Sequence, residues 1–235
     1  MQKHLISSLL LSSVLFGLAG AESIAKKSEL PVTEERQSEL TPEIVLEALK
    51  DGNARFVSGK RTKFDPEQSI LASSDGQFPK AYVLSCVDSR VPVEMVFDQG
   101  IGDIFVGRVA GNIENEDQLG SMEFASAVAG IRLIVVLGHE ACGAVKGACD
   151  HVELGNITRL IEKIAPAVRT VEGYEPSERN SKNPAFVEDV IKNNVLRTVA
   201  DIRERSPLLA ELEAKGSIKI VGAYYSLQDG AVKFL

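Results

Sequence analysis

Two short segments of the sequence combine side chains that bind metal ions with side chains that carry charge. The first reads VLSCVDSR and ends in a thiol, a carboxylate and a guanidinium, at Cys86, Asp88 and Arg90. The second is the apolar run LIVVL followed by GHEACG, which contains His139 and Cys142. Thiolate and imidazole groups are ligands that suit zinc. The residue types therefore predict a zinc site made of Cys86, His139 and Cys142.

Both segments begin as apolar runs, which are typical of buried β-strands. The C-terminal ends of parallel strands lie along one edge of a sheet, where sites form, so the two segments can meet there. On an extended strand Cys86 and Asp88 point to the same side, which makes Asp88 a possible fourth ligand. If His139 and Cys142 open a helix, their i, i+3 spacing places them on one face of that helix.

Together the two segments resemble the zinc signature of the β-class carbonic anhydrases, C-x-D-S-R followed by H-x-x-C-G. The resemblance extends from about Thr41 to the C-terminus. It implies an α/β fold with a central, mostly parallel β-sheet flanked by helices. It also implies one zinc ion per chain and a catalytic pair, Asp88 and Arg90, beside it. The predicted enzyme is a lyase that interconverts carbon dioxide and bicarbonate.

The chemistry expected of such a site follows from its ligands. Two thiolates and an imidazole leave a fourth position on zinc, and a water bound there has its pKa lowered from about 15.7 towards about 7. The resulting hydroxide can attack carbon dioxide at neutral pH. Asp88 would orient this hydroxide, and Arg90 would hold Asp88 through a bidentate contact. Without Arg90, Asp88 could bind zinc itself and close the site.

The resemblance also implies a substrate pocket. Gln77, Phe105 and Phe124 match pocket positions of the plant-like β-class enzymes, and the backbone N–H of Gly143 is a further candidate donor to bicarbonate. Those enzymes usually carry tyrosine where Phe124 stands, so this chain lacks a hydroxyl group there. Core packing is the alternative role for both phenylalanines, because it is the more frequent role of that residue. Arg108 matches the first residue of the family's R-x-x-x-N pattern.

The first 21 residues predict a secretory signal peptide. Lys3 precedes a mostly apolar run, which ends in an A-x-A pattern whose cleavage separates Ala21 from Glu22. An uncleaved membrane anchor is the alternative, but the apolar core is short for a span of about 20 residues. The mature protein is therefore expected to be periplasmic or secreted, without membrane association.

After the signal peptide, residues 22–40 are polar and charged, and we expect a flexible lead-in to a catalytic domain over 41–235. Thr41, Pro42 and Glu43 provide an N-cap, a first-turn proline and a first-turn acid, which predict the start of a helix. In the family a helix of this kind lies across a partner subunit, so the resemblance implies a homodimer or homotetramer.

The net charge of −7 argues against nucleic-acid binding, which needs a basic surface. Further helices are predicted over 120–130, 154–171, 186–205 and 207–215, and strands over 104–106 and 217–227.

Two other functions remain open at this stage. The same scaffold can serve carbon disulfide or carbonyl sulfide hydrolysis, as it does in some relatives, and the shape of the access tunnel would decide between these substrates. A non-catalytic structural zinc protein is the other alternative. Structural sites are usually closed by four Cys or His ligands, whereas three ligands beside an Asp–Arg pair favour an open position. Cys149 stays outside the predicted site, as a small buried or surface thiol.

Overall fold

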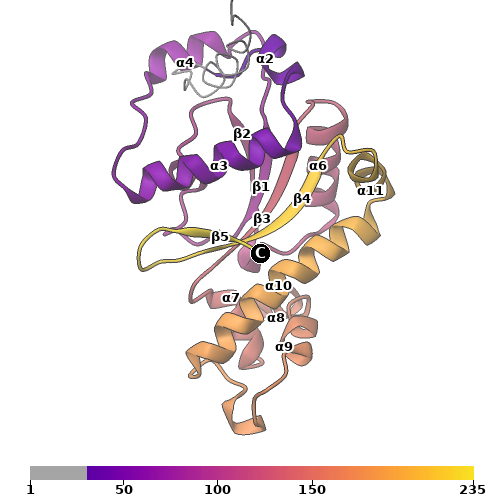
Figure 1. Cartoon of the computed structure of the whole chain (residues 1–235). Helices are drawn as coiled ribbons and strands as arrows, with labels where there is room; N and C mark the ends of the chain where they lie inside the picture. The colour runs from indigo at the N-terminus through magenta and orange to yellow at the C-terminus, as the bar shows by residue number, and fades with distance from the viewer. Residues whose placement is uncertain (1–30) are drawn as a thin grey trace, which may run out of the picture.

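The structure, a computed structural model, describes residues 31–235 (Figure 1). The predicted signal peptide and the first part of the lead-in lie outside the described residues. A five-stranded sheet with the strand order β2-β1-β3-β4-β5 forms the centre of the chain. Its strands are β1 (Ala81–Ser85), β2 (Ile104–Arg108), β3 (Leu133–His139), β4 (Lys219–Tyr225) and β5 (Val232–Phe234). The first four strands pair in parallel and β5 is antiparallel to β4, which confirms the predicted mostly parallel sheet.

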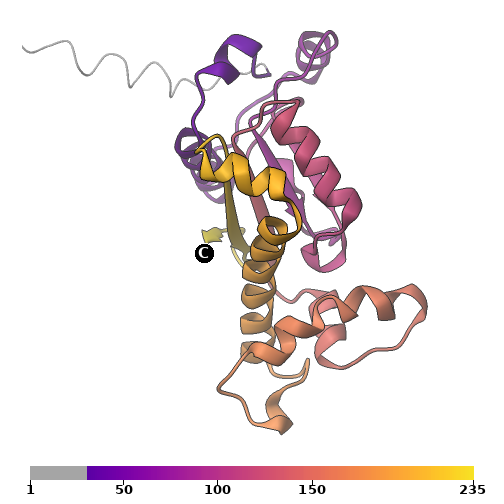
Figure 2. The same cartoon turned by 90° about the vertical axis from the view of Figure 1, so that its right-hand side faces the viewer.

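Helices cover both faces of this sheet (Figure 2). On one face lie α3 (Pro42–Val57) and α5 (Val93–Val96), and on the other lie α6 (Glu116–Ala127), α10 (Pro184–Arg205) and α11 (Pro207–Ala214). Successive strand residues point to opposite faces, so Val83 and Val135 join the core under α3 while Leu84 and Val136 join the core under α6 and α10. Every residue of β1 and β3 is buried, as expected for strands covered on both faces.

A lobe of short helices lies beyond the C-terminal ends of the parallel strands, below the sheet in Figure 1. It contains α7 (Gly143–Cys149), α8 (Gly155–Glu162) and α9 (Ala165–Thr170). The helices α7 and α9 pack against α10, and α8 packs against α7 and α9. The sequence predicts one helix over 154–171, and this prediction is wrong because the helix is interrupted. Pro166 stands in the first turn of α9, and proline is tolerated at a helix start but not in a helix interior.

Part of the expected flexible lead-in is ordered. Residues 34–38 form the helix α2 (Glu34–Ser38), which Thr33 caps. Gln37 is buried, and its side-chain amide donates to the carbonyl oxygens of Pro79 and Ala129 at 2.6 and 2.8 Å. These bonds fasten residues 34–38 to the turns that precede β1 and β3, so this part of the expected lead-in is packed against the sheet domain. The remaining short elements are α4 (Pro66–Ala72) and two 3₁₀ turns, η1 (Ala110–Asn112) and η2 (Pro176–Glu178).

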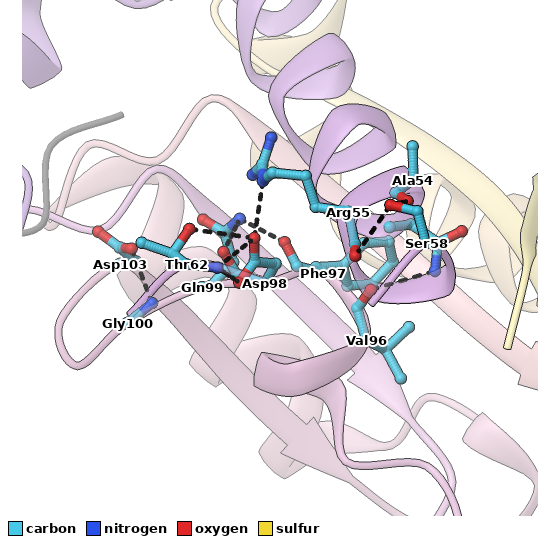
Figure 3. A network of polar contacts seen from close by, with 11 residues as sticks. Ala54, Arg55, Ser58, Thr62, Val96, Phe97, Asp98, Gln99, Gly100 and Asp103 are labelled. Carbon is cyan, nitrogen blue, oxygen red and sulfur yellow. Dashed lines mark hydrogen bonds and ion pairs between the residues drawn. The ribbon is translucent and has the colours of Figure 1, made fainter. Parts of the chain in front are cut away.

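A buried carboxylate, Asp98, joins α3 to the segment that follows α5 (Figure 3). It accepts hydrogen bonds from Arg55 Nε at 2.7 Å and from the backbone N–H and the hydroxyl of Thr62 at 3.0 and 3.1 Å. The backbones also approach closely, because a Cβ on Gly52 would lie 1.9 Å from the Phe97 carbonyl oxygen. This network supports the loop that leads away from the Cys86–Arg90 segment.

Asp98→Asn is expected to lower the free energy of unfolding by about 1–3 kcal/mol, because it leaves a partly buried guanidinium without its anion. Asparagine tolerates the φ of +51° at this position, so backbone strain does not contribute. The measurement is urea unfolding at a fixed protein concentration. Asp51→Asn, on the exposed surface of α3, is the matched control and should change stability little. Equal unfolding midpoints for the two variants would contradict the assigned role of Asp98.

Candidate metal centre

Cys86, His139 and Cys142 come together at the C-terminal ends of β1 and β3, the two neighbouring central strands. Cys86 directly follows β1, His139 is the last residue of β3, and Cys142 is the N-cap of α7. Their ligand atoms all lie within 4.8 Å of one another, and all three side chains are buried. The two sulfur atoms are 3.9 Å apart.

The backbone reaches this arrangement by a turn, not by a helix. The expectation that His139 and Cys142 share one face of a helix is wrong, because His139 still belongs to β3 and α7 begins only after Cys142. Between them Ala141 adopts a φ of +55°, in the left-handed region that non-glycine residues seldom enter. The turn aims both side chains at Cys86 across the strand ends.

The donor set fits a zinc ion. His139 is fully buried, and its Nε2 has no hydrogen-bond partner within residues 31–235. Its other ring nitrogen, Nδ1, lies 2.9 Å from the Glu140 carbonyl oxygen. That contact assigns the ring proton to Nδ1 and leaves the Nε2 lone pair directed at the two sulfurs. A buried nitrogen without a partner is costly, and a cation bound by one nitrogen and two sulfurs would remove that cost.

The two thiols are electrostatically coupled. A hydrogen bond from the Cys142 thiol holds the pKa of Cys86 well below its usual range, although burial acts in the opposite direction. The same hydrogen bond raises the pKa of Cys142, which therefore keeps the proton of the pair. One sulfur is thus ready to ligate as a thiolate, and metal binding would release the proton from the other.

Asp88 and Arg90 form the ion pair beside these ligands. Arg90 donates from Nε and Nη2 to the two carboxylate oxygens at 2.9 and 2.7 Å, and its backbone N–H donates at 2.9 Å. These hydrogen bonds hold the pKa of Asp88 far below its usual range, so the carboxylate is ionised at any ordinary pH. Asp88 Oδ2 lies 3.8 Å from His139 Nε2, next to the atom that would bind the metal. Arg108 fixes the same loop by donating to the carbonyl oxygens of Cys86 and Asp88 at 3.0 and 2.5 Å.

Of the four residues expected to line the substrate pocket, only Gly143 lies beside the metal ligands of the same chain, because it follows Cys142 at the start of α7. Gln77 instead precedes the N-terminal end of β1, whereas Cys86 follows its C-terminal end. The rings of Phe105 and Phe124 are tilted by 59° to one another with centroids 6.2 Å apart, and both line an open pocket of about 690 Å³ over β2 and α6. None of the three ligands lines that pocket.

Two residues that sequence reasoning overlooked also contact this region. The N–H of Gly111 donates to Cys86 Sγ at 3.3 Å, and the side-chain amide of Asn194 donates to the Gly111 carbonyl at 2.8 Å. One indication was present in the sequence: Asn194 is a polar residue at a position where the helical spacing of the α10 stripe predicts a buried side chain.

Cys149 does not belong to the ligand group. It is the last residue of α7 and is buried. Burial raises the pKa of its thiol to about 11, so the side chain is protonated and unreactive at neutral pH.

Comparisons with known proteins agree with the geometry. A family model described as carbonic anhydrase matches residues 81–232. Carbonic anhydrase 2 of Mycobacterium tuberculosis (strain H37Rv) is 39% identical over 197 residues, which cover 80% of this chain and 90% of that protein. A carbonic anhydrase of Mycolicibacterium smegmatis is 38% identical over 200 residues, covering 82% and 92%. Among solved structures, the β-carbonic anhydrase CafA of Aspergillus fumigatus superposes with a TM-score of 0.61 at 21% identity, over 82% of this chain and 89% of that one, a likeness of fold.

Proposed function

Because this chain belongs to the carbonic anhydrase family and has the fold of the β class, we propose that Cys86, His139 and Cys142 hold the zinc ion of a carbonic anhydrase. The enzyme is a lyase that converts carbon dioxide and water reversibly to bicarbonate and a proton. One observation carries the assignment of the site: the buried His139 Nε2, which makes no hydrogen bond within residues 31–235, lies within 4.8 Å of the sulfur atoms of Cys86 and Cys142.

The surrounding residues have separable roles in this chemistry. Zinc, when bound, supplies the Lewis acidity that makes water a nucleophile near neutral pH. Asp88 is an ionised hydrogen-bond acceptor next to His139 Nε2 and orients the attacking group, and Arg90 holds Asp88 in that place. The N–H of Gly143, in the first turn of α7, has no partner within the helix and is the proposed donor to a bicarbonate oxygen.

The decisive experiment is carbon dioxide hydration by the mature protein, with zinc content determined on the same samples. We expect one zinc per chain, loss of activity when a chelator removes the metal, and recovery when zinc returns. Zinc-loaded protein that hydrates no carbon dioxide but hydrolyses carbon disulfide or carbonyl sulfide would overturn the proposal in favour of the sulfur substrates. Zinc-loaded protein inactive on all three would make the site structural.

Self-association is the second part of the proposal. Gln77, Phe105 and Phe124 match pocket positions of the plant-like enzymes, yet in one chain they lie away from Cys86. Five strand residues separate Gln77 and Cys86, and a strand rises by about 3.3 Å per residue, so the two cannot flank one small substrate. Phe124 is 48% exposed on the outer surface of α6. We propose that these residues complete the site of a partner subunit in a dimer or dimer-based tetramer.

Mixing two inactive variants tests this arrangement. A Cys142→Ala chain retains the pocket residues, and a chain with Phe105→Ala and Phe124→Ala retains the zinc ligands. If each pocket serves the partner's metal, co-expression creates hybrid dimers with one complete site, and random pairing should restore about a quarter of the sites. Co-expression of each variant with itself is the control and stays inactive. No recovery in hybrids shown to form would mean that Phe105 and Phe124 do not serve the partner's site.

The third part concerns location. No helix among the described residues is long and apolar enough to cross a membrane. From the N-terminal sequence we propose cleavage between Ala21 and Glu22 and a periplasmic or secreted mature protein. N-terminal sequencing of the exported protein should begin at Glu22. Ala21→Phe should block processing, since the cleavage site needs small residues, whereas Ala25→Phe should not. An exported protein that still begins at Met1 would refute cleavage.

A further inference from the structure

We propose that Asn194, on α10, is a positioning residue for the metal centre, which holds Gly111 so that its N–H donates to the sulfur of Cys86. The inference rests on the proposed ligand set and adds two residues that do not touch the metal themselves. Its consequence is that a helix 83 residues further along the chain adjusts the electron density on one of the two sulfur ligands.

The first contact is the hydrogen bond to sulfur. The Gly111 nitrogen lies 3.3 Å from Cys86 Sγ, and both residues are buried, so water does not compete for the sulfur. A sulfur that accepts an N–H bond carries less negative charge and donates less of it to a bound cation. Hydrogen bonds to ligating sulfurs adjust the electronic properties of metal centres in this way. The Gly111 N–H should therefore keep the zinc a stronger Lewis acid than two bare thiolates would allow.

The second observation is that the geometry of Gly111 is demanding. Its φ of +73° lies in the left-handed region, and a Cβ there would lie 2.5 Å from the Ile164 side chain. Gly111 is the middle residue of η1, a turn of three residues with no side-chain cap. Glycine permits this conformation but does not enforce it, because its backbone is the least restricted of any residue. Another group must therefore fix its orientation.

Asn194 is that group. It is 3% exposed, and its Nδ2 donates to the Gly111 carbonyl at 2.8 Å, across 83 residues of sequence. Its neighbours along α10, Ile191 and Val195, are apolar and pack against the sheet. Burying an amide in such a stripe costs free energy unless it is hydrogen-bonded. The bond fixes the carbonyl on one side of the Gly111 Cα and so limits rotation of the N–H on the other side.

The preceding residue on the helix provides a matched control. Asn193 also donates its side-chain amide to a backbone carbonyl, that of Ala167, at 2.8 Å, and to the Thr170 hydroxyl at 2.8 Å. These bonds tie α10 to α9 and make no contact with Gly111. Asn193→Leu and Asn194→Leu therefore both remove an amide of similar size from α10, but only the second change removes the bond to Gly111.

The test uses full-length mature protein carrying zinc, cobalt or ¹¹³Cd. In the cadmium form, NMR should show a scalar coupling between the metal and the Gly111 amide across the N–H···S bond. Asn194→Leu should abolish this coupling. It should weaken zinc binding in chelator competition by roughly 10–100-fold, because the Cys86 sulfur loses the contact that holds it in place. It should also move the sulfur-to-cobalt charge-transfer band to lower energy, because the sulfur becomes more electron-rich. Asn193→Leu should leave all three readouts unchanged. Asn194→Ala, which removes the donor without adding bulk or charge, should reproduce the effects of Asn194→Leu.

The outcomes separate this inference from the proposed function. If wild-type protein binds no metal, or if Cys142→Ala binds it equally well, the ligand set fails. If wild-type protein binds metal normally but shows no coupling to Gly111, or if the Asn194 variants keep the wild-type affinity and spectrum, only this inference fails. Equal losses in the Asn193 and Asn194 variants, or loss of folding in both Asn194 variants, would assign Asn194 a general packing role and overturn the proposal.

Discussion

Cys142→Ala is expected to abolish stoichiometric zinc binding and to reduce carbon dioxide hydration to background. The variant removes one of three buried ligands whose atoms lie within 4.8 Å of one another. Each ligand contributes a large share of the metal-binding free energy, so affinity should fall by on the order of 100-fold or more. Zinc content after dialysis against a weak chelator and the rate of carbon dioxide hydration measure the two effects.

Cys149→Ala is the control, because the chain offers a second buried thiol on the same helix. This substitution also removes a thiol sulfur, but that sulfur is not a metal ligand. Zinc content and activity should therefore stay at the wild-type level, while stability falls slightly through lost packing. Full zinc occupancy in Cys142→Ala would mean that the metal is held elsewhere and that the assigned site is wrong.

Arg90→Ala is expected to keep the zinc and to lose activity by on the order of 100-fold. Arg90 has no lone pair to offer a metal, so binding does not need it. Its bonds at 2.9 and 2.7 Å are what hold the Asp88 carboxylate beside the ligands. Once free, Asp88 remains ionised at neutral pH, since even its ordinary pKa is about 4. The nearest cation is then the metal, and the carboxylate is expected to turn onto it and block access.

The measurement is carbon dioxide hydration from mildly acidic to alkaline pH, with zinc determined on the same samples. Wild-type activity should rise with pH. Raising the pH should not restore the activity of Arg90→Ala, because that variant is inactive through the changed position of the Asp88 carboxylate and not through its protonation. Arg159→Ala, the same change at an exposed position of α8, should behave like wild type. Near-normal activity of Arg90→Ala at full zinc content would show that the ion pair is structural.

The central strands could be predicted from the sequence, because a strand that is buried on both faces is apolar at nearly every position. Segments such as LIVVL are apolar at every position, and the structure places every residue of β1 and β3 in the interior. The ligand set was predictable from residue type and from the position of each ligand after such a run. The turn between His139 and Cys142 could not be predicted. It depends on the left-handed backbone of Ala141, and an alanine in the sequence does not indicate that conformation.

Other features depend on contacts between segments far apart in the chain. The amide of Asn194 reaches Gly111 across 83 residues, and Gln37 reaches Ala129 across 92, so neither local pattern reveals its partner. The pocket residues raise a different difficulty. Matching Gln77 and Phe124 to a family pattern predicts a pocket role for them, but it does not say whether that role is at the metal centre of their own chain or of another subunit.

The position of the ligands on the two central strands has a consequence for the order in which the chain folds. Cys86 and Cys142 are 56 residues apart, whereas His139 and Cys142 are near neighbours. A chain in which β1 and β3 have not yet paired can offer an ion only the second, local pair. Cys86 joins when the parallel strands meet, which closes a long loop and is a slow event compared with local turns. The rate at which tight zinc binding develops during refolding should therefore report the rate at which β1 and β3 pair.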